Sequence, residues 1–205
     1  MTSDTTLQGP VLVVGAGIGG MAAALALAQS GFAVDLFEQA AQIGEIGAGI
    51  QLGPNAFAAA DALGCGPRAR ALAVYNEELV MMDAVDGAEV ARMPVGEDFR
   101  QRFGNPYAVI HRVDVHLSLL EGAQESGRVE FHTRARVENI EQPADREPID
   151  NWIVGRATLP GDAAHPTTHH MHHGACMATD NAVTMGATLR ATGNPSANVI
   201  ARYQR

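Results

Sequence analysis

Apolar and polar residues are arranged along the first forty positions in a pattern that predicts a strand, a turn, a helix and a second strand. A β-branched run at 11–14, "VLVV", passes directly into "GAGIGG". The stretch "MAAALALAQS" that follows is rich in strong helix formers and ends at Gly31, a residue typical of helix ends. The run "FAVDLFE" then alternates as a strand does and ends at Glu38. Residues 11–38 therefore predict a βαβ unit.

The middle of the chain predicts a loop, a helix and a hairpin. A glycine-rich segment after Glu38 leads through Pro54 into a helix of Ala and Leu, and we expect that segment to be a loop. Two extended runs, 75–85 and 88–95, flank Asp86-Gly87 and predict a β hairpin.

Further along, residues 106–126 predict a strand that runs into a helix, with Arg112 at the junction. The segment 129–133, "VEFHT", predicts a short strand, and "RARVENIEQ" after it is expected to continue extended, with Arg134 and Arg136 on a solvated face. The pattern as a whole predicts an α/β fold: a Rossmann-like parallel sheet with a small β hairpin appendage. We expect a single domain over 1–205, assembled from 1–142 and 143–205.

Composition narrows the class of protein. The chain has 205 residues, of which 46% are hydrophobic and 18% charged, and this suits one packed domain. A formal charge of −9 without a basic cluster argues against a nucleic-acid partner. No apolar run is long enough to cross a membrane and no signal-like segment opens the chain, so we expect a cytoplasmic protein. Cys65 and Cys176 have no metal-type spacing and are expected to be reduced thiols.

Gly15, Gly17 and Gly20 fit the GxGxxG pattern of dinucleotide-binding folds. The first glycine permits the tight turn, the second lets the pyrophosphate approach the backbone, and the third lets helix and strand pack closely. The phosphates would lie at the helix N-terminus, and Glu38 would accept hydrogen bonds from a ribose. An ordinary structural turn is the alternative, but the strand, helix and acid around the motif favour a dinucleotide. The motif does not choose between NAD and FAD, and the acid at 38 disfavours NADP.

Longer motifs resemble a known family. "VVGAGIGG", "FEQAAQIGEIGAGIQLGPNA", "HRVDVHLSLL", "DREPIDNWIVGRATLPGDAAHPTT" and "GACMATDNAV" together are similar to the single-component FAD-dependent aromatic hydroxylases, in the branch of salicylate and 3-hydroxybenzoate 6-hydroxylases. The resemblance implies FAD as cofactor, NADH as transient reductant and a small aromatic acid as substrate. It also implies cofactor contacts beyond the first motif: Arg112 at the pyrophosphate, Asp162 at the ribityl or ribose hydroxyls, Pro166 beside the flavin ring, and the backbone of Gly174 and Ala175 at the pyrimidine edge.

The chain departs from the family in its middle and at its end. Family members have a long segment between the strand like "RARVENIEQ" and the "DREP" motif, whereas here Gln142 is followed immediately by "PADREPIDNW". The chain also ends at Arg205, before the C-terminal helices that such proteins have. The family's histidine base falls in the absent segment, so no catalytic residue is assigned. We therefore expect a shortened member, uncoupled or inactive in hydroxylation because the substrate segment is missing.

Five histidines fall between 165 and 173. His165 belongs to the family motif, but four others replace the residues that relatives have next to the helix: His169, His170, His172 and His173. In a helix some of these would share a face at the i, i+4 spacing of zinc sites, so a divalent metal site is one interpretation. A solvated or flavin-adjacent loop is the favoured one. The alternative function is accordingly a shortened or engineered FAD-binding module with a histidine metal site and no native catalysis; a degenerate fragment that scarcely folds is a third.

The remaining histidines have simpler interpretations. His111 is expected to be a buried, hydrogen-bonded strand residue, and His116 and His132 to be structural or surface residues. Nothing in the pattern indicates an oligomeric state.

Overall fold

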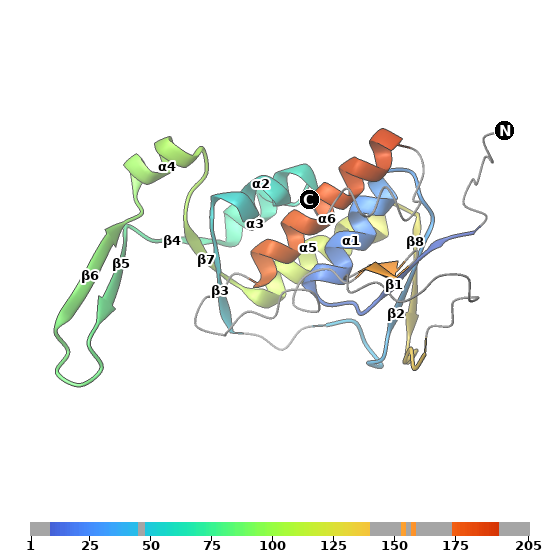
Figure 1. Cartoon of the computed structure of the whole chain (residues 1–205), viewed down its shortest axis with the longest axis horizontal. Helices are drawn as coiled ribbons and strands as arrows, with labels where there is room; N and C mark the ends of the chain where they lie inside the picture. Colours follow the sequence, from blue (N-terminus) through green and yellow to red (C-terminus); the bar gives the residue numbers. More distant parts are fainter. Residues whose placement is uncertain (1–8, 45–47, 140–152, 155–156, 159–173, 193–205) are drawn as a thin grey trace.

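A computed structural model describes residues 9–44, 48–139, 153–154, 157–158 and 174–192 (Figure 1). Asp162, Pro166 and the predicted metal residues His169 to His173 lie outside these residues. No helix in the described part of the chain is long and apolar enough to span a membrane.

The predicted βαβ unit is confirmed. Strand β1 (Val11–Val14) leads through the glycine turn into helix α1 (Ile18–Gln29), which returns the chain to strand β2 (Val34–Glu38). The two strands are parallel, and β2 also pairs in parallel with β8 (Val129–Thr133), giving a sheet of order β1-β2-β8. This parallel sheet with its glycine turn is the Rossmann-like fold that the sequence predicts.

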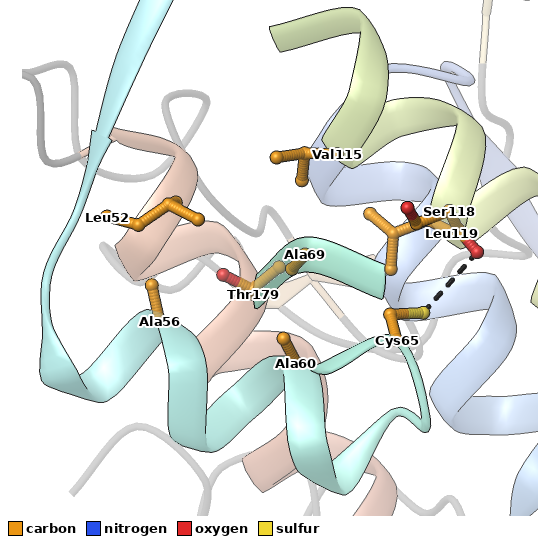
Figure 2. A pocket seen from close by; sticks show the side chains of 9 residues that line it. All are labelled: Leu52, Ala56, Ala60, Cys65, Ala69, Val115, Ser118, Leu119 and Thr179. Carbon is orange, nitrogen blue, oxygen red and sulfur yellow. Dashed lines mark hydrogen bonds between the residues drawn. The ribbon is translucent and has the colours of Figure 1, made fainter. Parts of the chain in front are cut away.

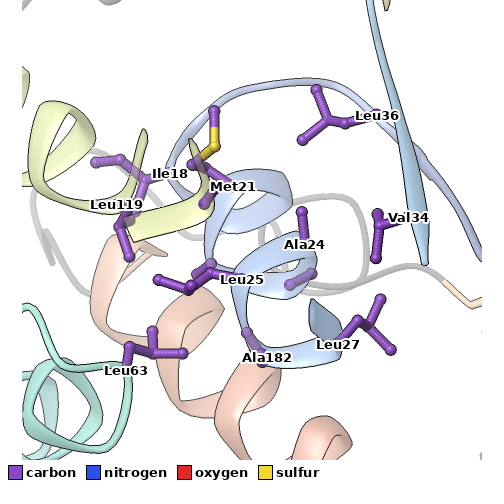
Figure 3. Close-up of a cluster of buried hydrophobic side chains, with 14 of the residues drawn as sticks. Ile18, Met21, Ala24, Leu25, Leu27, Val34, Leu36, Leu63, Leu119 and Ala182 are labelled. Carbon is purple, nitrogen blue, oxygen red and sulfur yellow. The ribbon is translucent and has the colours of Figure 1, made fainter. Parts of the chain in front are cut away.

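Helix α1 forms the centre of the main core (Figure 3). It is apolar all round because α5 (Arg112–Glu125) and α6 (Gly174–Thr192) both pack against it, on sides that do not face the sheet. Leu25 and Leu27 from α1 are buried together with Leu36 from β2 and Leu119 from α5. The helices thus fix the glycine turn from which α1 begins.

Helix α6 approaches α1 closely. A Cβ atom added at Gly186 would lie 3.0 Å from the Cβ of Ala26 and 3.1 Å from its carbonyl oxygen. The Ser30 hydroxyl, at the end of α1, donates a hydrogen bond of 3.0 Å to the Gly186 carbonyl. These contacts bring residues more than 150 positions apart into one layer (Figure 1).

A second, antiparallel sheet lies beside the first core. Its order is β3-β7-β4, and helices α2 and α3 pack near it around the fully buried Phe57. The bounds are β3 (Gly49–Leu52), α2 (Pro54–Ala62), α3 (Gly66–Leu72), β4 (Val74–Tyr75) and β7 (Ala108–His111). The prediction of a loop from Glu38 to Pro54 is therefore wrong at β3. The pairing of "GIQL" with β7, some sixty residues later, is a tertiary interaction that a glycine-flanked run does not reveal.

The predicted hairpin is confirmed as β5 (Glu78–Met82) and β6 (Glu89–Pro94), which are antiparallel. Gly87 adopts φ +71° in the turn, a conformation that favours glycine. Together with α4 (Glu97–Phe103), the hairpin projects from the rest of the chain (Figure 1). It is the β appendage expected from the sequence.

The predicted strand into helix is also confirmed, since β7 ends at His111 and α5 begins at Arg112. His111 is exposed, which contradicts its expected burial, because the last residue of β7 already lies at the helix junction. The expected extension after β8 is wrong at Arg134, and residues 140–142 of that run lie outside the described residues. Arg134 has φ +56° and ends the strand at Thr133. The chain then turns back so that the Arg134 and Ala135 amides donate to the carbonyls of Ala40 and Glu38.

Two short strands and the last helix complete the described chain. Strand β9 (Ile153–Val154) pairs antiparallel with β10 (Ala157–Thr158). Helix α6 begins at Gly174. The Asn55 amide at the start of α2 donates a 2.6 Å hydrogen bond to the Asp180 carboxylate and so links α2 to α6.

Candidate cofactor-binding site

The glycine turn between β1 and α1 is the centre of the candidate site. Gly15 adopts φ +92°, which L side chains rarely do, and Gly17 is the N-cap of α1 with no side-chain cap. The first turn of α1 contains no acidic residue, so nothing of the helix's own neutralises the positive end of its dipole. An anion would therefore be stabilised at this helix N-terminus.

Gly20 is the point of closest packing in the turn. A Cβ atom added there would lie 1.8 Å from the Gly15 carbonyl oxygen, far inside van der Waals contact. The obstacle is backbone, which cannot rotate away as a side chain can. Only glycine therefore fits at position 20, as expected for the third glycine of the motif.

Glu38 at the end of β2 is joined to the same turn. Its Oε2 accepts a 2.8 Å hydrogen bond from the Ala16 amide, and its Oε1 accepts one of 2.8 Å from the Ala40 amide. The Ala16 bond, followed by the Ala40 bond, lowers the pKa of Glu38 below its ordinary value of 4.5. Each oxygen of an ionised carboxylate can accept further hydrogen bonds, so Glu38 keeps capacity for a ligand hydroxyl.

Helix α5 contributes a residue that the sequence left without a role in this site. His116 is fully buried, and its Nε2 lies 2.6 Å from the Ala16 carbonyl oxygen. The predicted Arg112 lies one helical turn earlier on α5, and its backbone amide donates to the Ala48 carbonyl at 3.2 Å. The i, i+4 spacing of Arg112 and His116 on one predicted helix was the only sign in the sequence that relates the two residues.

The structure thus brings together four of the predicted residues: Gly15, Gly17, Gly20 and Glu38. His116 contacts the same turn from α5, and Arg112 lies one helical turn before it. Gly174 and Ala175 open α6, as noted above.

Asp35, Glu130 and His132 form a separate polar group on strands β2 and β8. One ring nitrogen of the histidine and one carboxylate oxygen from each acid lie within 4.8 Å of one another. Atoms of these kinds can bind a metal ion. The His132 ring stacks on Phe37, with ring centroids 4.7 Å apart, and its Nε2 lies 3.4 Å from the Asp35 carboxylate. The stacking on Phe37 holds the His132 ring beside Asp35, and Glu130 is exposed. We therefore assign no metal to this group.

A small cavity lies between α2, α3, α5 and α6, and none of the residues that line it belongs to the glycine turn (Figure 2). Its walls are almost wholly apolar, and it is too small for a substrate-sized molecule. Cys65 faces it, and the Cys65 Sγ donates to the Ser118 carbonyl at 3.4 Å. The cavity is therefore a packing void beside a buried thiol.

Burial raises the pKa of the Cys65 thiol to about 11. Because the thiolate is the reactive form, we expect Cys65 to react with iodoacetamide at pH 8 roughly a hundredfold more slowly than a free thiol does. The measurement is mass-spectrometric labelling of a Cys176→Ser variant, with the urea-unfolded protein as control. Rapid labelling of the folded protein would contradict the burial of this residue.

A Rossmann-type dinucleotide-binding unit is the class of protein that the sheet, the glycine turn and Glu38 define. A family model described as "NAD(P)-binding Rossmann-like domain" matches residues 13–62. The 3-hydroxybenzoate 6-hydroxylase of Polaromonas naphthalenivorans (strain CJ2) is 39% identical over 338 aligned positions, which cover 99% of this chain and 84% of the relative. The chain belongs to this family of FAD-dependent aromatic hydroxylases.

Other matches agree in fold and differ in coverage. The 3-hydroxybenzoate 6-hydroxylase of Klebsiella oxytoca is 45% identical over 82% of this chain and 47% of its own length. Klebsiella pneumoniae HpxO, solved with FAD and uric acid, has a TM-score of 0.80 at 18% identity and covers 98% of this chain and 85% of its own. P. aeruginosa PqsL, solved with 2-aminobenzoylacetate, has a TM-score of 0.78 at 14% identity, and the match covers 95% of this chain and 90% of PqsL.

Coverage also shows how this chain differs from its relatives. The alignment with the Polaromonas protein runs over 338 positions, although this chain has 205 residues. A long part of the relative therefore has no counterpart in this chain. The match to the Klebsiella oxytoca protein spans about half of that relative.

Proposed function

We propose that this chain binds FAD at the glycine turn. The observation that carries the proposal is the joint geometry of Gly15, Gly20 and Glu38: a left-handed turn, a helix packed onto it without room for a Cβ, and an ionised carboxylate held by the turn's own amide. These residues fit a pyrophosphate at the N-terminus of α1 and a ribose at Glu38. In the same proposal Arg112 pairs with the pyrophosphate.

The far half of the cofactor would be held by residues named from the family resemblance. Asp162 would accept hydrogen bonds from the ribityl or ribose hydroxyls, and Pro166 would lie beside the flavin ring. The backbone amides of Gly174 and Ala175, at the N-terminus of α6, would stabilise negative charge at the pyrimidine edge.

When bound, FAD supplies the redox chemistry of the family, taking a hydride from NADH and passing the electrons to O₂. The described residues hold and orient the cofactor rather than perform bond changes. Glu38 remains ionised at neutral pH and binds hydroxyl groups, while the turn amides and Arg112 hold the phosphates. The relatives' names point to a small aromatic acid such as 3-hydroxybenzoate as the substrate.

We further propose that hydroxylation by this chain is uncoupled. Productive transfer of oxygen needs a closed site from which water is excluded, and the part of the chain between Gln142 and the "DREP" motif is short compared with that of the family. The apolar cavity between α2, α3, α5 and α6 is too small for an aromatic acid. Each NADH and proton would then reduce one O₂ to H₂O₂, with release of NAD⁺, and leave the aromatic acid unchanged.

Purified protein reconstituted with FAD tests this proposal when it is incubated with NADH and 3-hydroxybenzoate or salicylate. We expect NADH oxidation to be matched by peroxide with little hydroxylated acid, measured by chromatography and a peroxidase assay. Hydroxylated product equal to the NADH consumed would contradict the uncoupling.

A parallel assay after treatment with EDTA, together with metal analysis, tests the alternative function, a module with a histidine metal site. Stoichiometric metal together with no flavin binding would favour the metal-binding module.

A further inference from the structure

We propose that His116 is a positioning residue that fixes the Ala16–Gly17 peptide and aims the Gly17 amide at the bound pyrophosphate. This inference rests on the proposed FAD site and adds a residue to it. His116 is 0% exposed, and its Nε2 lies 2.6 Å from the Ala16 carbonyl oxygen, a hydrogen bond between two elements a hundred residues apart.

The direction of this bond follows from its partner. A carbonyl oxygen only accepts hydrogen bonds, so the His116 Nε2 carries the hydrogen. The other ring nitrogen, Nδ1, is buried and has no hydrogen-bond partner among the described residues. A buried polar atom without a partner costs stability, and an apolar side chain at this position would avoid that cost. The bond from Nε2 is therefore the feature that an imidazole supplies here.

The two peptides around Ala16 are held from opposite sides. In the Gly15–Ala16 peptide, the Ala16 amide donates to Glu38, and the Gly15 carbonyl oxygen faces Gly20, where it lies 1.8 Å from a Cβ built there. The carbonyl and amide of a trans peptide point in opposite directions, so these two contacts fix the same peptide plane.

The same rule applies to the next peptide. The Ala16 carbonyl points to His116 in the protein interior, so the Gly17 N–H of that peptide points the opposite way, out of the interior. Gly17 is the N-cap of α1, where the backbone amides bind an anion. The His116 bond therefore sets the orientation of an amide that faces the cofactor's phosphates.

The test compares two substitutions of His116. In His116→Gln the side-chain amide can still donate to the Ala16 carbonyl, whereas in His116→Met the volume is similar and no donor remains. We expect FAD to bind about tenfold more weakly to His116→Met, measured by flavin fluorescence, and within about threefold of the unsubstituted protein to His116→Gln. Ser118→Ala is the matched control. It removes a buried hydroxyl from the same helix, one that bonds to Asp114 and not to the turn, and should leave FAD binding unchanged.

A second measurement does not need FAD. In the cofactor-free protein, nitrogen NMR should show the hydrogen of the His116 ring on Nε2, and the Ala16 amide should exchange with solvent about tenfold faster in His116→Met than in His116→Gln. If the unsubstituted protein binds no FAD while these results hold, the proposed function fails and the positioning of the turn stands. Hydrogen on Nδ1 alone, equal FAD affinity in both variants, or a His116→Gln variant as weak as His116→Met would each overturn the positioning role.

Discussion

Replacement of Gly20 by alanine is expected to abolish FAD binding and to lower the free energy of unfolding by about 3 kcal/mol. The added methyl group would lie 1.8 Å from the Gly15 carbonyl oxygen. Because that oxygen belongs to the backbone, either α1 moves off β1 or the Gly15–Ala16 peptide rotates. Rotation would break the bond from the Ala16 amide to Glu38, so the turn would lose its shape in either case.

Gly122→Ala is the control for this substitution. Gly122 is also a helical glycine that faces α1, but the added methyl would meet side-chain atoms alone, the nearest being the Leu25 Cδ2 atom at 3.1 Å. The end of a leucine side chain can shift, and alanine is a better helix former than glycine. We expect this variant to bind FAD normally and to unfold within about 1 kcal/mol of the parent protein. Urea unfolding followed by circular dichroism measures both variants, and equal effects of the two substitutions would contradict the packing account of Gly20.

Glu38→Gln is expected to weaken FAD binding about a hundredfold or more, since it replaces a carboxylate that would accept charge-assisted hydrogen bonds from the ribose. It should also lower stability by about 1–3 kcal/mol at pH 7, because the side-chain amide can accept from only one of the Ala16 and Ala40 amides. Isothermal titration with FAD and urea unfolding measure the two effects.

The stability effect of Glu38 should depend on pH in a definite direction. Its pKa in the folded protein is below its ordinary value of 4.5, so ionised Glu38 stabilises the fold fully above that value. The contribution is lost as the pH falls through the lowered folded pKa. The difference in unfolding free energy between the parent and Glu38→Gln should therefore shrink below about pH 4.5.

Asp35→Asn is the control on the same strand. Asp35 lies within β2, where its carboxylate is beside His132, so this variant should keep the parent's affinity for FAD. A hundredfold loss in Asp35→Asn as well would indicate a general disturbance of β2 instead of the loss of a specific ligand.

Local patterns in the sequence were sufficient to predict the elements that form the centre of the site. The turn glycines and the end of β2 at Glu38 depend on neighbouring residues, and their physical requirements can be read from spacing alone. The hairpin was predictable for the same reason, because Asp86-Gly87 supplies a turn between two extended runs.

Long-range contacts account for what the sequence did not predict. Strand β3 exists because it pairs with β7, and Arg134 ends β8 because its amide bonds back to Ala40. The role of His116 depends on a carbonyl a hundred residues away, so composition and periodicity could show only that it shares a helix with Arg112. Partners of this kind become visible only when the chain is folded.

Titration of the purified, flavin-free protein with FAD tests the central claim most directly. We predict quenching of flavin fluorescence that saturates at one FAD per chain, competition by ADP for the adenine half of the site, and no saturation with Gly20→Ala. Absence of FAD binding by a protein that circular dichroism shows to be folded would contradict the account.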